Sequence, residues 1–132
     1  MNIILDIETD GLLDTLTKVH CIVIKELLGT HCEVLQIARN ESEIQSILKT
    51  LENNHVIGHN ILGFDLEVLR RLYGFEIPVD QVTDTLILSR LLHADLREED
   101  KWVQRIDPKY WGSHSLEAWG HRLDHYKGDF GN

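Results

Sequence analysis

The chain has 132 residues, which suffices for a single domain with one hydrophobic core. Its 42% hydrophobic content excludes a disordered acidic tail, and 22 acidic against 13 basic residues give a formal net charge of −9. This charge argues against coating of nucleic acid through a basic surface, but it leaves open a site built from carboxylates and divalent cations. No basic leader and no apolar run of about 18 residues are present, so the sequence predicts a cytoplasmic protein without a membrane partner.

The first third of the chain predicts three strands. Residues 2–8 form an apolar run that ends on two carboxylates, which is typical of a short buried strand. Residues 9–17 are a polar connection containing glycine. Residues 18–27 and 31–37 then predict two strands joined by a turn at residues 28–30.

Two helices and a short strand follow. Asn40 and Glu43 form a capping box, which predicts that a helix begins at this point. Apolar side chains then recur at helical spacing, at Ile44, Ile47, Leu48 and Leu51. Residues 55–58 predict a strand, and residues 64–73 predict a second helix that Gly74 ends.

In the last third, Asp84 is placed to be the N-cap of a third helix, residues 85–93, which a short strand precedes. The charged segment 94–112 predicts a long surface loop, and residues 114–123 predict a fourth helix. Three aromatic residues of this loop are expected to pack within it, with DNA contact as the alternative: Trp102, Tyr110 and Trp111. The order of elements predicts an α/β fold, with a mixed sheet opened by an antiparallel meander of three strands and continued by parallel strands under flanking helices.

Three carboxylates stand out as candidate metal ligands. Asp6 and Glu8 are two positions apart on the first strand, so their side chains should emerge on the same face. Asp65 opens the second helix directly after a short strand. Hydrolysis of a phosphodiester by two metal ions needs carboxylates that converge from different segments. Each feature alone also fits a plain alternative, a solvated turn for the first pair and a helix cap for Asp65.

Four stretches in this order resemble the 3′→5′ proofreading exonuclease domain of phage-type family A DNA polymerases, which is DnaQ-like and RNase H-like. They are DIETDGL at 6–12, HNILGFDLEVL at 59–69, DTLILSRLLHADL at 84–96 and GSHSLEAWGHRL at 112–123. The resemblance covers nearly the whole chain. It implies a single exonuclease domain over residues 1–132, in the cytoplasm of a phage-infected host cell.

The resemblance also implies roles for particular residues. Asp6, Glu8 and Asp65 would be catalytic and would coordinate Mg²⁺ or Mn²⁺, of which the family binds two ions. Asp6 would bridge both ions and Glu8 would also orient the attacking water. The substrate would be the 3′ end of single-stranded DNA.

For that substrate, Thr9 and Leu12 match positions that contact the terminal nucleotide, with Leu12 wedged against the last base. Asn60 matches a position near the terminal sugar or phosphate. Apolar wedging tolerates any base, which suits a protein that binds frayed ends. Asp84 belongs to the same resemblance, as a residue behind the metal ligands or as the plain helix cap.

The sequence departs from the family at the third motif, Tyr-x3-Asp or His-x4-Asp. His125 and Asp129 have the x3 spacing, but Gly128 lies between them and the segment has no apolar face. We therefore expect an incomplete domain that lacks the family's C-terminal helix, binds one metal ion or none, and has weak or no activity alone. It would be a piece of a longer polymerase, a subunit of a split polymerase, or a non-catalytic DNA- or partner-binding module. An acidic inhibitor protein on the same fold is a further alternative.

A missing helix would also leave apolar surface uncovered. We expect apolar strand residues on both faces of the sheet, among Ile3, Leu5, Ile22 and Ile24. Such a surface predicts a homodimer, a second chain or polymerase segment that supplies the helix, or marginal stability.

Overall fold

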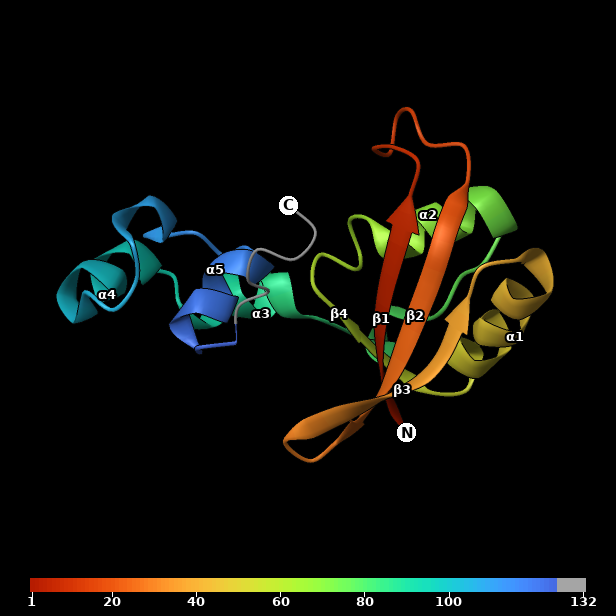
Figure 1. The fold of residues 1–132 in the computed structure, drawn as a ribbon, viewed down its shortest axis with the longest axis horizontal. Coiled ribbons are helices and arrows are strands. Elements are labelled where there is room, and N and C mark those ends of the chain that lie inside the picture. The colour runs from red at the N-terminus through yellow and green to blue at the C-terminus, as the bar shows by residue number, and fades with distance from the viewer. Residues whose placement is uncertain (126–132) are drawn as a thin grey trace. The chain divides into compact units, whose positions relative to one another are not determined.

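The computed structural model describes residues 1–125 and separates the chain into two compact units, residues 1–85 and residues 86–132. The first unit holds a five-stranded sheet in the order β3-β2-β1-β4-β5 (Figure 1). Its strands are β1 (Asn2–Thr9), β2 (Val19–Leu28), β3 (His31–Ala38), β4 (His55–Gly58) and β5 (Val82–Asp84). The first three form an antiparallel meander, and β4 and β5 are parallel to β1. The predicted mixed α/β sheet is therefore confirmed.

Alternation along β1 sorts its side chains between the two faces of the sheet. Ile3, Leu5 and Ile7 are buried, whereas Asp6 and Glu8 are exposed on the opposite face. Because a strand has a side-chain period of two, this pattern follows directly from the sequence.

One expectation about this sheet is wrong. Ile3, Leu5, Ile22 and Ile24 do not divide between the two faces but are all buried in one core. The reason is the strand register, which pairs Leu5 with Ile24 and so turns these residues to the same side.

Helix α1 (Glu41–Glu52) begins at the predicted capping box. The Asn40 side chain accepts a hydrogen bond from the Glu43 N–H at 2.9 Å and donates one to Glu43 Oε1 at 2.7 Å. The four apolar residues predicted to face the core are all buried. They pack against the buried strand residues and cover one face of the sheet.

Helix α2 (Asp65–Tyr73) ends at Gly74, whose φ of 63° lies in the left-handed region that favours glycine. Leu69 of this helix belongs to the same core as α1. A short 3₁₀ turn, η1 (Val79–Gln81), then leads into β5.

The second unit is helical. Its elements are α3 (Thr85–Leu92), which begins one residue earlier, α4 (Leu96–Val103), the 3₁₀ turn η2 (Pro108–Tyr110) and α5 (Leu116–Arg122). The prediction of a long loop over 94–112 is therefore wrong, since α4 lies within it. Only Leu96 and Asp100 of α4 are buried, and most of its residues are charged, so its composition is that of a solvated surface segment.

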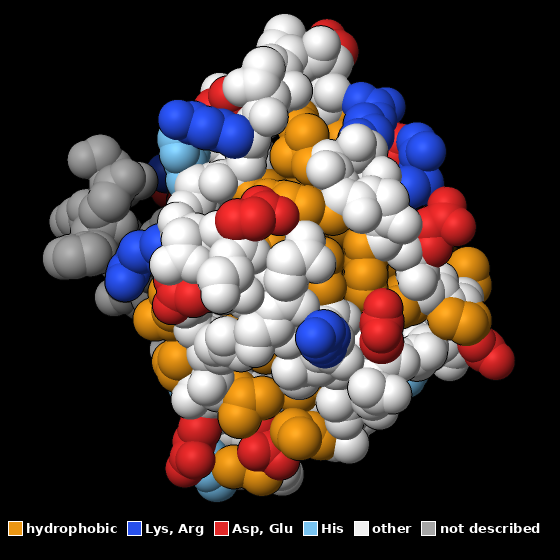
Figure 2. Space-filling view, turned by 90° about the vertical axis from the view of Figure 1, so that its right-hand side faces the viewer, with side chains coloured by type: hydrophobic (Ala, Val, Ile, Leu, Met, Phe, Trp, Pro, Cys, Tyr) orange, Lys and Arg blue, Asp and Glu red, His pale blue; other side chains and the backbone are white. Residues whose placement is uncertain are grey.

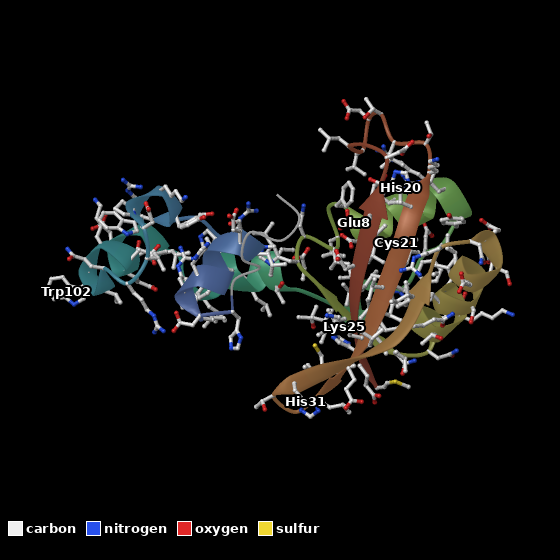
Figure 3. The ribbon with its side chains drawn as sticks, in the orientation of Figure 1. Glu8, His20, Cys21, Lys25, His31 and Trp102 are labelled. Atoms are coloured by element: carbon white, nitrogen blue, oxygen red, sulfur yellow. The ribbon has the colours of Figure 1, made fainter. Side chains whose placement is uncertain are left out.

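The expected packing of Trp102 is also wrong. This side chain is 91% exposed and projects from α4 (Figure 3). The other two aromatic residues do make contacts, since Trp111 Nε1 donates to the Ile106 carbonyl and Tyr110 Oη donates to Glu117.

A buried ion pair holds the second unit together. Arg122 donates to both carboxylate oxygens of Asp100, at 2.9 and 2.7 Å, and Asp100 also accepts from the Gly112 N–H. The Arg122 guanidinium lies 4.7 Å from the ring centroid of Trp119. Trp119 Nε1 in turn donates to Ser89 Oγ, which lies 2.6 Å from His114 Nδ1. Polar groups at this depth are stable only when they are paired in this way.

Among residues 1–125, no helix has the length and apolar character needed to cross a membrane. The face seen in Figure 2 carries acidic and basic side chains interspersed with hydrophobic ones, and it shows no single basic patch.

Candidate active site

The exposed face of β1 carries two of the three predicted metal ligands. Asp6 and Glu8 lie opposite Val23 and Cys21 of β2, so all four side chains share one face of the sheet. Glu8 lies near the C-terminal end of β1, beside Cys21 (Figure 3). In the part of the chain that the structure describes, neither carboxylate forms an ion pair with a lysine or arginine.

Asp65 reaches the same strand from a distant part of the sequence. β4 pairs with β1 only over Asn2–Ile4, so beyond Ile4 no strand of residues 1–125 pairs with that edge of β1. Helix α2, which Asp65 opens, contacts β1, and the backbone of Ile7 acts to lower the pKa of the Asp65 carboxyl. The Asp65 carboxyl therefore lies near the strand residue between Asp6 and Glu8.

Burial raises the pKa of the Asp65 carboxyl to about 7, and the nearby charge of Asp6 adds to the rise. The Asp84 carboxylate raises this pKa as well, while the Ile7 hydrogen bond opposes the shift. Asp65 is only 8% exposed. Two carboxylates held near each other without a basic partner resist ionising together, and a divalent cation would relieve this repulsion.

The side chains do not form a ready-made cluster of ligands. Within residues 1–125, no group of three or more His, Cys, Asp or Glu side chains is arranged to hold a metal ion. Asp6 and Asp65 are electrostatically coupled, and Glu8 shares the face of Asp6. For the three carboxylates to bind one ion, their side chains would have to come closer together.

The loop between β4 and α2 carries the predicted substrate residue Asn60. Its backbone has a φ of 58°, a left-handed conformation that asparagine adopts more readily than most residues. The Asp84 carboxylate holds this loop, since it accepts hydrogen bonds from the N–H groups of Asn60 at 2.9 Å and Leu62 at 3.1 Å. Asp84, which the sequence predicted as a helix cap, therefore connects the end of β5 to the loop that leads into Asp65.

Gly63 completes this loop. A Cβ atom at Gly63 would lie 2.5 Å from Oδ1 of Asn60, so the asparagine side chain occupies the space that any other residue would need. Asp84 thus holds the backbone of Asn60, and the lack of a side chain at Gly63 leaves room for the Asn60 side chain.

Of the predicted nucleotide-contact residues, Thr9 is the last residue of β1, and Leu12 lies in the loop that follows this strand. Thr9 Oγ1 donates to the Gly11 carbonyl at 2.7 Å, and Leu12 is 74% exposed. Asp10 closes the loop that contains Leu12, because its carboxylate accepts hydrogen bonds from the backbone N–H groups of Thr17 and Lys18 and from the Thr17 hydroxyl.

Sequence reasoning missed three residues of this region: Asp10, Gly63 and Arg71, whose Nη1 donates to the carbonyl of Leu13 in the Leu12 loop. Asp10 stands before a glycine, which is a turn signal that could have identified it. Gly63 and Arg71 gave no such signal. Gly63 meets Asn60 only because of the shape of the loop, and Arg71 meets Leu13 from a distant position in the sequence. The His125-x3-Asp129 spacing remains a sequence observation, because Asp129 lies outside the described residues.

The sheet and its flanking helices define a mixed α/β protein compatible with the RNase H-like fold. The chain is 33% identical, over 142 aligned positions, to the DNA-directed DNA polymerase of Escherichia phage T7, a match that covers 97% of this chain and 20% of that polymerase. It is 32% identical over 139 positions to the DNA-directed DNA polymerase of Enterobacteria phage T3, covering 95% of this chain and 19% of the relative.

No protein-family model matches the chain. The chain is thus homologous along almost its entire length to phage DNA polymerases, and it spans about a fifth of the length of these relatives.

Proposed function

We propose that this chain is the 3′→5′ exonuclease region of a phage-type DNA polymerase and that, acting alone, it hydrolyses single-stranded DNA from the 3′ end only slowly. The observation that carries the proposal is the approach of Asp65 to β1: the helix that it opens contacts this strand, and the Asp65 carboxyl lies near enough to Asp6 for the two charges to be coupled. Two carboxylates from distant segments, without a basic partner among the described residues, are the arrangement expected of a divalent metal site. Homology to phage DNA polymerases supports the same assignment.

The chemistry of these donors fits Mg²⁺ or Mn²⁺, since both ions prefer carboxylate oxygens. Asp6 and Asp65 would hold the ion, and Glu8 would join them from the same face of β1. When bound, such ions activate water and stabilise the leaving oxygen of a phosphodiester. Glu8 is placed to accept a proton from the attacking water, because it is exposed at the end of the strand.

The surrounding residues suit a single-stranded substrate. Leu12 offers an exposed apolar side chain just beyond the carboxylates of β1, and it can pack against a terminal base of any identity. Asn60 offers an amide on a loop that the fold holds in place. Thr9 lies between these carboxylates and the Leu12 loop.

The test is degradation of a 5′-labelled single-stranded oligonucleotide in the presence of Mg²⁺ or Mn²⁺. We expect a ladder that shortens from the 3′ end, that EDTA abolishes, and that Asp6→Ala and Asp65→Asn each slow by at least about a hundredfold, since about 1.4 kcal/mol of transition-state stabilisation is tenfold in rate. Asp14→Asn is the matched control, because it removes an exposed carboxylate for which no hydrogen bond to residues 1–125 is found.

Two results would contradict the proposal. Hydrolysis that persists unchanged in Asp6→Ala would place the chemistry elsewhere. Metal-independent binding of DNA or of a polymerase segment, without any hydrolysis under conditions where Mn²⁺ binds, would favour the non-catalytic module instead.

A further inference from the structure

The loop that carries Leu12 is held at its base by Asp10. The carboxylate of Asp10 accepts hydrogen bonds from the N–H groups of Thr17 and Lys18 at 2.8 and 3.1 Å, and Asp10 N–H donates to the Lys18 carbonyl. These bonds join the two ends of the loop. Inside it, the N–H groups of Thr15 and Leu16 both donate to the Leu12 carbonyl, so the residue with the exposed side chain is fixed through its own backbone.

A second attachment comes from α2, the helix that Asp65 opens. Arg71 donates through Nη1 to the Leu13 carbonyl at 2.5 Å. The same guanidinium is oriented by Glu67, which accepts from Arg71 Nε at 2.9 Å. One helix therefore carries a candidate metal ligand at its start and an anchor for the Leu12 loop near its end.

We propose that Asp10 and Arg71 are positioning residues that hold Leu12 at a set place relative to Asp6, Glu8 and Asp65, so that the terminal base and the scissile phosphate are engaged together. This inference rests on the proposed exonuclease function. Asp10 fixes the loop to the strand that carries Asp6 and Glu8, and Arg71 fixes it to the helix that carries Asp65. Neither residue touches the reacting atoms.

The physical gain is preorganisation. A polar loop loses conformational entropy when it becomes ordered. If the loop is already ordered before the DNA binds, this entropy loss does not reduce the binding affinity. An exposed leucine has no structural use in the folded protein by itself. Held rigidly beside carboxylates, it can wedge against an unpaired base.

The experiment measures binding of a single-stranded oligonucleotide with 2-aminopurine as its 3′-terminal base, with Ca²⁺ in place of Mg²⁺ to limit hydrolysis. We expect Asp10→Asn and Arg71→Gln each to weaken binding by about three- to tenfold, which lies in the range expected for the loss of a typical hydrogen bond. In the hydrolysis assay the same variants should raise KM by a similar factor and change kcat little, and Mn²⁺ affinity should stay unchanged.

The chain offers matched controls. Arg70→Gln removes the same charge from a neighbouring arginine that also binds Glu67 but makes no bond to the loop. Asp14→Asn removes a carboxylate from the same loop. Both controls should bind the oligonucleotide as the wild type does.

Coupling to Leu12 separates positioning from a general loss of structure. In a Leu12→Ala background, Asp10→Asn and Arg71→Gln should each weaken oligonucleotide binding by less than about twofold, because the leucine side chain that they position is gone. The inference would be overturned if the two variants lost the same affinity with and without Leu12, or lost no more affinity than the controls. Either result would leave the exonuclease proposal intact. Failure of the wild type to engage a 3′ end at all would overturn both.

Discussion

The carboxylate of Asp84 accepts a hydrogen bond from the backbone N–H of Asn60 at 2.9 Å, across 24 positions of sequence. It accepts a second from Leu62, so a single buried carboxylate at the end of β5 sets the course of the loop between β4 and α2. The backbone of Asn60 is in the left-handed conformation, and Asp65 comes directly after the loop, at the start of α2. Asp84 thus acts on the candidate site through the backbone that it holds.

Replacing Asp84 should destabilise the first unit. Asp84→Ala leaves the N–H groups of Asn60 and Leu62 without their acceptor, and we expect it to lower the free energy of unfolding by about 2–4 kcal/mol, given about 1–3 kcal/mol for each donor left unsatisfied. Asp84→Asn keeps one acceptor oxygen and should cost about half as much. Urea denaturation followed by far-UV circular dichroism measures this, and a loss below about 0.5 kcal/mol for the alanine variant would contradict it.

Two glycines that border the same loop should respond differently to alanine. At Gly63 the added Cβ would meet the end of the Asn60 side chain, which can move aside. We expect Gly63→Ala to cost little stability but to weaken binding of a 3′-terminal oligonucleotide, because Asn60 is displaced. At Gly58 the Cβ would lie 2.9 Å from Cβ of Ile61, a fully buried residue.

Gly58→Ala should therefore cost about 1–3 kcal/mol, the usual range for overpacking a core. Thermal unfolding of both variants, together with their oligonucleotide affinities, tests this contrast. If Gly63→Ala were more destabilising than Gly58→Ala, the loop would be fixed by contacts other than those described.

Asp65 should make stability depend on pH. Its pKa of about 7 in the folded protein exceeds the unfolded value of about 3.9, so the folded state binds more protons between these values. The contribution of the Asp65 carboxyl to stability is therefore fully present below about pH 4 and is lost progressively as pH rises to about 7. Asp65→Asn removes this loss, and we expect it to stabilise the protein by about 1–3 kcal/mol at pH 8 and by nothing at pH 4.

Chemical denaturation at both pH values measures the effect, with Asp14→Asn as the exposed control. If a metal site exists, Mg²⁺ at pH 8 should stabilise the wild type and not the variant, because only the wild type retains the ligand. Equal stabilisation of both proteins by Mg²⁺ would argue that Asp65 does not bind it.

The Asp100–Arg122 pair should dominate the stability of the second unit. Both side chains are less than 10% exposed, at 7% and 9%, so removing one leaves the other charge buried without its partner. We expect Arg122→Ala to cost about 3–5 kcal/mol, whereas Arg105→Ala, which breaks an exposed pair with Asp124, should cost less than about 1 kcal/mol.

Tryptophan fluorescence reports this change selectively, because all three tryptophans lie after residue 85. The hydrogen bonds from Arg122 lower the pKa of the Asp100 carboxyl, so the contribution of the pair is present at neutral pH and is lost as pH falls below about 4. Equal effects of Arg122→Ala and Arg105→Ala would show that burial does not set the strength of this pair.

Features that depend on neighbouring residues could be predicted from the sequence alone. The capping box of Asn40 and Glu43, the left-handed stop at Gly74, and the shared face of Asp6 and Glu8 all follow from local geometry. Each is settled within a few residues by the period of a helix or strand and by the conformations that a side chain permits. Helix α4 was not predicted because most of its residues are charged, which is the composition of a surface loop.

Only the tertiary structure decided how distant residues meet. β4 pairs with β1 only as far as Ile4, and the Asp65 carboxyl lies near Ile7, beyond that point; Asp84 reaches Asn60, and Arg71 reaches Leu13. These contacts depend on strand order, register and the length of each strand, which are settled by packing of the whole core rather than by any short stretch. Thus the sequence could name the carboxylates of the candidate site, whereas the pKa of Asp65 and the attachment of the Leu12 loop arise only when the chain is folded.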